Sequence, residues 1–137
     1  MEVTAISTMT NDTAVSSGLS PEDLKDLVET SLDADKAEDI VTIDLRGKTT
    51  IADYMIVANG RSTRQVGALA DKILERLREK GMKSIRVEGL AQGDWVVIDA
   101  GDVVVHLFRP EVRDFYNIEK IWGVEQGAAD QVMYLSA

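Results

Sequence analysis

The sequence is poor in the residues that build disulfides, metal centres and membrane spans. Its 137 residues include no cysteine and a single histidine, and only 5% of them are aromatic. A chain without cysteine has no disulfide framework and no thiol chemistry, which suits a reducing cytoplasm, so we expect a cytoplasmic protein. A structural zinc site lacks the cysteine and histidine ligands it needs. No apolar run approaches the roughly 20 residues of a membrane-spanning helix, so no membrane association is expected.

Positive charge is also scarce. There are 15 basic and 24 acidic residues, and the formal net charge is −9. An acidic domain repels phosphate backbones, so we expect no direct binding to DNA. The same charge favours a basic protein partner. The length and an apolar content of 45% are those of one ordinary globular domain.

Composition divides the chain into three parts. Residues 1–19 are rich in serine, threonine and alanine and carry little apolar mass, so we expect a disordered N-terminal tail. Ser20 and Pro21 then form a strong helix start, which opens a single domain over residues 20–123. Residues 124–137 contain one glycine and scattered apolar side chains, and we expect a loose C-terminal strap or a disordered tail.

Within the domain, hydrophobic periodicity predicts the order α-β-β-α-β-β-β-α. The expected helices begin after Ser20, after Ser62 and at Pro110, and the expected strands are Ile40–Leu45, Tyr54–Ala58, Ser84–Glu88, Trp95–Ile98 and Val103–Phe108. This is an α/β (α+β) domain with a mixed sheet of about five strands and helices packed over it. The first two strands are nearly continuous in apolar residues, so we expect both to be central and covered on both faces.

The last two strands predict a tight hairpin. We place its loop at Ala100 and Gly101, because Gly101 accepts the positive φ that such loops demand. This register gives the pairs Asp99–Asp102, Val97–Val104 and Trp95–His106. Side chains alternate along a strand, so one face of the hairpin is purely aliphatic and belongs in a core. The other face carries an indole, an imidazole and two carboxylates, and we expect it to be partly exposed.

Three groups of polar residues invite a catalytic interpretation, and each also has a plainer one. Asp99 and Asp102 suggest a metal or acid–base pair, but two acids at a tight turn more often shape the turn. The segment Gly60–Ser62 joins a strand to a helix N-terminus and could hold a phosphate, or simply cap that helix. His106 is the only imidazole, and no nucleophile accompanies it; a hydrogen-bonded structural role beside Trp95 is favoured.

The aromatic residues of the last helix indicate a binding surface instead. Phe115 and Tyr116 are consecutive and cannot face the same way, so we expect one to be buried and the other to reach the surface. Arg113 and Lys120 are positioned to flank it. Tryptophan, tyrosine and arginine dominate the energetic hot spots of protein interfaces. With no complete catalytic set, the residues favour a binding module over an enzyme, with no cofactor and no metal.

Several motifs in order resemble one known family. These are the segments Gly93–Phe108 (GDWVVIDAGDVVVHLF) and Glu111–Trp122 (EVRDFYNIEKIW), and upstream Lys36–Ile40 (KAEDI), Asp44–Gly47 (DLRG), Ile51–Tyr54 (IADY) and Gly60–Ser62 (GRS). The sequence is similar to the ribosomal silencing factor family, also called the Iojap family, from about Leu24 to Trp122. That resemblance implies a nucleotidyltransferase-like fold without the catalytic acids, and the chain indeed has no Asp-x-Asp or Asp-x-Glu on a strand after Ser62.

The resemblance also implies a function. Members of the family bind the fourteenth ribosomal protein of the large ribosomal subunit at the subunit interface, block joining of the small subunit and repress translation. By resemblance the contact surface lies on the hairpin face and the neighbouring helix ends. The candidate partner-binding residues are Trp95, Asp99, Asp102, His106, Tyr116, Lys120, Ser62 and Arg64.

Two alternatives remain open. One is a large-subunit assembly factor that uses the same surface. The other is a metal-dependent nucleotidyl transferase built on Asp99, Asp102 and the Gly60–Ser62 turn. An exposed aromatic face can also pair with a second copy by two-fold symmetry, so a homodimer of the free protein is allowed but not required.

Overall fold

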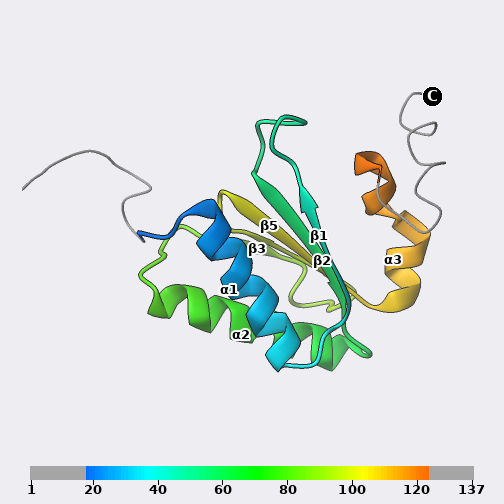
Figure 1. The fold of residues 1–137 in the computed structure, drawn as a ribbon. Helices are drawn as coiled ribbons and strands as arrows, with labels where there is room; N and C mark the ends of the chain where they lie inside the picture. Colours follow the sequence, from blue (N-terminus) through cyan, green and yellow to red (C-terminus); the bar gives the residue numbers. More distant parts are fainter. Residues whose placement is uncertain (1–17, 124–137) are drawn as a thin grey trace, which may run out of the picture.

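The computed structural model describes residues 18–123, so the expectations for residues 1–17 and 124–137 lie outside the described residues. The predicted order of elements is confirmed, with one short 3₁₀ helix added after the last α-helix (Figure 1). The elements are α1 (Pro21–Ala34), β1 (Glu38–Asp44), β2 (Tyr54–Asn59), α2 (Thr63–Glu79), β3 (Arg86–Glu88), β4 (Trp95–Asp99), β5 (Val103–Phe108), α3 (Pro110–Tyr116) and η2 (Ile118–Trp122).

The five strands form one mixed sheet in the order β1-β2-β5-β4-β3. All neighbouring pairs are antiparallel except β2 and β5, which run parallel. The expected central position is therefore correct for β2 and wrong for β1, which lies at an edge. Because β5 pairs with the inner side of β2, β1 is left with one neighbour, and its first residues Glu38 and Asp39 are exposed.

Helices α1 and α2 lie together on one face of the sheet, which we call the closed face (Figure 1). The predicted caps position both of them. Ser20 Oγ accepts a hydrogen bond from Asp23 N at 3.0 Å, and Ser62 Oγ accepts one from Gln65 N at 3.1 Å. Each bond satisfies one of the backbone N–H groups that a helix start leaves without a partner. Gly81, with φ of 91°, follows the end of α2 as predicted.

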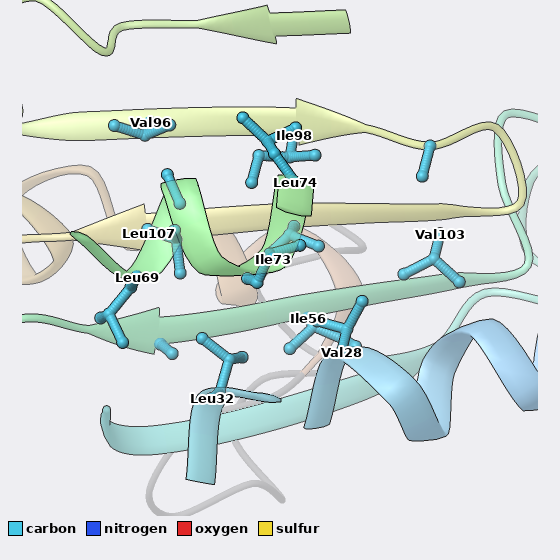
Figure 2. Close-up of a cluster of buried hydrophobic side chains, with 14 of the residues drawn as sticks. Val28, Leu32, Ile56, Leu69, Ile73, Leu74, Val96, Ile98, Val103 and Leu107 are labelled. Atoms are coloured by element: carbon cyan, nitrogen blue, oxygen red, sulfur yellow. The ribbon is translucent and has the colours of Figure 1, made fainter. Parts of the chain in front are cut away.

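The main core fills the space between these helices and the sheet (Figure 2). Its side chains are almost all aliphatic, and those labelled in Figure 2 are Val28, Leu32, Ile56, Leu69, Ile73, Leu74, Val96, Ile98, Val103 and Leu107. They come from alternate residues of β2, β4 and β5 and from one stripe each of α1 and α2, as strand and helix periodicity require. Leu19, at the predicted boundary of the tail, packs against this core.

The opposite face of the sheet, the open face, is covered in part by α3 and η2 (Figure 1). A smaller core lies there, with Phe108 at its centre and Ile43, Leu45 and Val57 also buried. Trp95 and Trp122 pack against it while remaining partly accessible. The expectation that this face is partly exposed is confirmed.

The hairpin register differs from the prediction. The observed pairs are Trp95–Phe108, Val97–His106 and Asp99–Val104. The loop is Gly101–Asp102, one residue later than expected, because Ala100 N–H bonds to Val103 O at 3.0 Å and Asp99 Oδ1 accepts from Gly101 N at 2.9 Å. Gly101, with φ of 88°, takes the first loop position. The pairing shifts by two residues, which is the repeat of a strand, so every side chain keeps its predicted face.

Candidate partner-binding site

One edge of the sheet gathers the aromatic residues that the sequence singled out. β2 and β5 are parallel and end together there, and β4 starts there because it runs the other way. The ends are joined by backbone hydrogen bonds: Gly60 N–H donates to Phe108 O at 2.9 Å, and Arg109 N–H donates to Asp94 O at 3.1 Å. Trp95, the first residue of β4, is therefore held beside the start of α3 on the open face.

Trp95 is the centre of an aromatic cluster. Its indole lies 4.9 Å from the ring of Phe108 and 4.9 Å from the ring of Tyr116, measured between ring centroids. Its Nε1 donates a hydrogen bond to His106 Nδ1 at 2.9 Å. The predicted cross-strand pair of Trp95 and His106 is wrong, but the shift in register makes them diagonal neighbours, which long side chains can bridge. Packing on two rings and one hydrogen bond fix the orientation of the indole.

His106 serves this cluster as a neutral hydrogen-bond acceptor. Burial lowers its pKa to about 4, because the charged imidazolium is poorly solvated there. At neutral pH the ring carries one proton, and since Nδ1 accepts from Trp95, that proton is on Nε2. No acid orients the ring in the manner of a catalytic base among the described contacts. The geometry matches the structural role that the sequence favoured.

A surface groove of about 460 Å³ opens next to Trp95. Its lining residues belong to the β4 start and to α3: Asp94, Trp95, Glu111, Val112, Phe115 and Tyr116. Arg109 lies at the rim and pairs with both lining acids, from Nε to Asp94 Oδ1 at 2.8 Å and from Nη1 to Glu111 Oε2 at 2.6 Å. The groove thus combines aromatic walls with an acidic rim.

Both consecutive aromatic residues of α3 reach the surface. Phe115 is 79% exposed and Tyr116 is 53% exposed, and their rings meet edge to face at 5.0 Å. The expectation that one of the two is buried is wrong, because α3 has only seven residues and covers the sheet through Val112 and Arg113 instead. Two large exposed aromatics beside a groove are unusual on a surface without a partner.

Arg113 is the residue whose role the sequence analysis missed. It is 7% exposed, and its guanidinium bonds Glu119 through Nε at 3.0 Å and through Nη2 at 2.8 Å. Its Nη1 also donates to Asn59 Oδ1 at 3.0 Å and to the backbone oxygen of Asp39 at 2.7 Å. These bonds tie α3 to η2, to the end of β2 and to the irregular start of β1. A seven-residue helix has too little periodicity to reveal which of its charges is buried.

Asp99 ends β4, about 13 Å from Trp95 at the usual rise per strand residue, and Asp102 lies in the hairpin loop beyond it. Asp99 is bonded within the turn, as its plainer interpretation predicted. Burial, together with the nearby carboxylates of Asp53 and Glu22, raises the pKa of Asp102. Within residues 18–123 no three His, Cys, Asp or Glu side chains are grouped as metal ligands would be.

The remaining candidates, Ser62, Arg64 and Lys120, lie at the start of α2 and on η2. Ser62 is engaged in capping α2, and Arg64 is exposed in the first turn of that helix. The loop before Trp95 lies against this turn: a Cβ on Gly93 would come within 3.0 Å of Thr63. Lys120 is half-buried on η2. The structure therefore brings together Trp95, His106 and Tyr116, and separates them from the two hairpin acids.

Across the described part of the chain, the helices are too short or too polar to cross a bilayer.

Comparison with known proteins gives a consistent result. A family model described as "Ribosomal silencing factor during starvation" matches residues 19–135. A Zymomonas mobilis protein named ribosomal silencing factor RsfS is 54% identical over 103 residues, which are 75% of this chain and 77% of the relative. A mouse protein named "Mitochondrial assembly of ribosomal large subunit protein 1" is 30% identical over 82% of this chain and 50% of its own length.

A solved structure agrees with the fold. The crystal structure of a Chromobacterium violaceum protein superimposes with a TM-score of 0.76 at 41% identity, covering 79% of this chain and 90% of that one. The mixed five-stranded sheet with its helices is thus the fold of this group, whereas a relation to nucleotidyltransferases stays a prediction. The resemblance noted in the sequence is confirmed, and the chain belongs to the ribosomal silencing factor family.

Proposed function

We propose that the protein binds the large ribosomal subunit through its fourteenth ribosomal protein, blocks joining of the small subunit and so represses translation in the cytoplasm. Membership of the silencing factor family supports binding to the ribosome and repression of translation. The location of the contact rests on one observation: the exposed rings of Phe115 and Tyr116 lie with the partly exposed Trp95 along an acid-rimmed groove. Exposed aromatics around a pocket are typical of interface hot spots.

Charge supports a contact with protein on the subunit. Ribosomal proteins are as a class rich in lysine and arginine because they pack against RNA, and this chain carries a net charge of −9. An acidic protein is repelled by exposed RNA but attracted to a basic protein patch, so a protein contact on the subunit is favoured over an RNA contact. Blocking then needs no enzyme: a domain bound at the subunit interface excludes the small subunit by its volume.

Two measurements test this function. The first is co-sedimentation of the purified protein with isolated large subunits, and the second is light scattering of subunit joining after the small subunit is added. We expect stoichiometric co-sedimentation and a dose-dependent block of joining. Tyr116→Ala is expected to weaken both about 10-fold or more, whereas Lys83→Ala, on an exposed loop remote from α3, is expected to change neither. Binding without any block of joining would contradict the silencing step.

A second candidate is assembly of the large subunit, and the name of the mouse relative favours it. The same surface would then act on an incomplete subunit. Profiles of ribosomal particles in cells that lack the protein distinguish the two. Accumulated precursors of the large subunit indicate assembly, whereas normal subunits that join too readily under starvation indicate silencing.

We further propose that the protein acts without catalysis. The groups of the nucleotidyl transferase alternative are used otherwise, since Asp99 bonds the hairpin turn and Ser62 caps α2. Incubation with nucleoside triphosphates and magnesium is expected to release no pyrophosphate. Release by the wild type that disappears in the Asp99→Asn, Asp102→Asn double variant would overturn this view.

We also propose that the free protein can self-associate through the same surface. Exposed Phe115 and Tyr116 form a patch that can meet its own copy about a two-fold axis. If it does, dimerisation and subunit binding compete for one surface. Light scattering over a dilution series, with the wild type and with Phe115→Ser, tests this. A dimer that persists in the variant would place the dimer contact elsewhere.

A further inference from the structure

We propose that the groove beside Trp95 is a receptor for one cationic side chain, an arginine that a basic protein partner inserts between the aromatic rings and the acidic rim. That this partner is a ribosomal protein rests on the proposed function. The chemistry of the receptor does not, because it follows from the residues that line the groove: three aromatic rings, two carboxylates and one valine.

The aromatic rings of the groove provide the first interaction with the arginine, which is the attraction between its positive charge and the ring faces. Trp95 and Tyr116 lie 4.9 Å apart with their planes tilted by 41°, and Phe115 stands at 90° to Tyr116. The walls of the groove therefore present ring faces and ring edges in several directions. Ring faces carry negative electrostatic potential and attract cations, most strongly at tryptophan. Because Trp95 is held by His106 and Phe108, its ring is fixed before a partner arrives.

The two carboxylates at the rim provide the second interaction, which is a charged hydrogen bond to the arginine. Asp94 and Glu111 each use one oxygen toward Arg109, and their side chains remain 48% and 63% exposed. Two acids against one guanidinium leave the rim with a net negative charge, and none of the six lining residues is basic. A carboxylate accepts more than one hydrogen bond, so both acids retain the capacity for a second donor.

Arginine fits this arrangement better than other side chains. Its planar guanidinium stacks on aromatic rings and also donates to carboxylates, whereas lysine presents a compact, strongly hydrated charge. The volume of about 460 Å³ lies near the lower end of ligand pockets, roughly 300–1,000 Å³. It therefore accommodates a side chain with its neighbours and not a whole element of secondary structure. A phosphate or an acidic peptide would be repelled.

Peptide probes test the receptor on the isolated protein. We would titrate the full chain with the blocked tripeptides Gly-Arg-Gly, Gly-Lys-Gly and Gly-citrulline-Gly and follow the indole N–H signals of the tryptophans by NMR. Citrulline has nearly the shape of arginine but no charge. We expect the arginine peptide to shift the Trp95 signal and to bind about fivefold or more tightly than the citrulline peptide. Lysine is expected to fall between them.

Equal shifts with arginine and citrulline, or no shift with any peptide up to high millimolar concentration, would overturn the receptor. Assignment of the Trp95 signal comes from a Trp95→Phe spectrum. Phe115→Leu keeps the apolar volume but removes the ring. Unchanged binding of the arginine peptide to this variant would also count against the receptor, because the walls would then act only as an apolar surface.

Variants test the receptor in the complex. Glu111→Gln is expected to weaken binding to isolated large subunits about fivefold and to reduce its dependence on salt, because one charge of the contact is gone. The matched control is Asp114→Asn, another exposed acid on the same helix that does not line the groove, for which we expect near-normal binding. Equal effects of the two variants would mean that only general charge matters, and the receptor would be refuted.

The two proposals fail in different ways. If the wild type binds arginine peptides but not large subunits, the receptor stands and the proposed ribosomal partner is wrong. If the wild type binds large subunits while the peptides and Glu111→Gln have no effect, the ribosomal function stands and the receptor is wrong.

Discussion

The two faces of the sheet show how one small domain separates stability from recognition. The closed face lies under α1 and α2, and its side chains are aliphatic and almost completely buried. The open face lies under a seven-residue helix and one 3₁₀ turn, and it keeps Trp95, His106 and Val97 partly accessible. β4 and β5 contribute alternate side chains to both faces. A single hairpin thus serves both as core and as candidate interface.

The way each face is held also differs. On the closed face, non-directional burial of apolar area dominates, and it tolerates small shifts of the helices. On the open face, α3 is attached through directional bonds of Arg113 to Glu119, Asn59 and the backbone of Asp39. Directional bonds fix the orientation of α3 on the sheet. The exposed rings of α3 need a fixed orientation in order to present a preformed surface.

Removal of Arg113 should cause the largest loss of stability, because Arg113 attaches α3 to the open face. Arg113→Ala leaves the buried carboxylate of Glu119 without its partner, which typically costs about 3–5 kcal/mol. Urea denaturation measures the loss. The double variant Arg113→Met, Glu119→Leu removes both charges and should recover much of the stability, yet still bind large subunits poorly because α3 is no longer oriented. Full stability of Arg113→Ala would show that α3 is held by apolar contacts alone.

Trp95 should separate binding from folding. Trp95→Ala is expected to weaken large-subunit binding by about 2 kcal/mol or more. Its cost in stability should stay below the roughly 3–5 kcal/mol of a fully buried tryptophan, because its indole is only partly covered. Sedimentation and denaturant melts measure the two quantities. Trp95→Phe, which keeps a ring beside Tyr116 but loses the bond to His106, should fall between. A variant that fails to fold would place Trp95 in the core.

Acid should weaken the open face through His106. Its pKa is about 4 in the folded protein and near 6.5 in the unfolded chain, so between these values the unfolded state binds the extra proton. The stability that the neutral ring contributes is complete above pH 6.5 and is lost as the pH falls toward 4, by an amount on the order of 3 kcal/mol. His106→Asn supplies a similar acceptor without titrating, and its melts between pH 7 and 4.5 should show a smaller decline. Parallel declines would exclude His106 as the cause.

Two adjacent valines, Val96 and Val97, compare the packing of the two faces directly, and we expect the smallest difference in stability here. Val96 is completely buried under α2, and Val97 is partly exposed on the other face of the same strand. Val96→Ala should cost about 2 kcal/mol, since two methyl groups leave a packed core, and Val97→Ala should cost less than about 1. Both should bind large subunits normally per folded molecule. Equal costs would mean that the two faces are equally packed and would remove the basis of the comparison.

Sequence reasoning predicted the local features well, because their causes are local. The caps at Ser20 and Ser62, the stop at Gly81 and the start of α3 at Pro110 depend on groups within one turn of a helix. The division of the hairpin into two faces also depends only on alternation. It survived a wrong register because the error was two residues, the period of a strand.

The candidate site was predicted in part. Trp95, His106 and Tyr116 do come together, but Asp99 and Asp102 lie at the far end of the strand, and Phe115 was expected to compete with Tyr116 for burial. Arg113 was seen only as a flanking charge, although it holds α3 in place. In each case the prediction needed to know which element packs against the residue in the fold. A local sequence pattern does not contain that information.

Residue types and their spacing were enough to predict the helices and strands, the aliphatic closed face, the acidic charge and the kinship with ribosomal silencing factors. Three features became clear only in the folded structure: β1 is an edge strand, Arg113 is buried, and α3 leaves both Phe115 and Tyr116 exposed beside Trp95. These features arise from contacts between segments far apart in the chain. Asp39, Asn59 and Arg113 meet because β1 pairs antiparallel and β5 parallel with β2, which brings the start of β1 and the ends of β2 and β5 to one edge of the sheet.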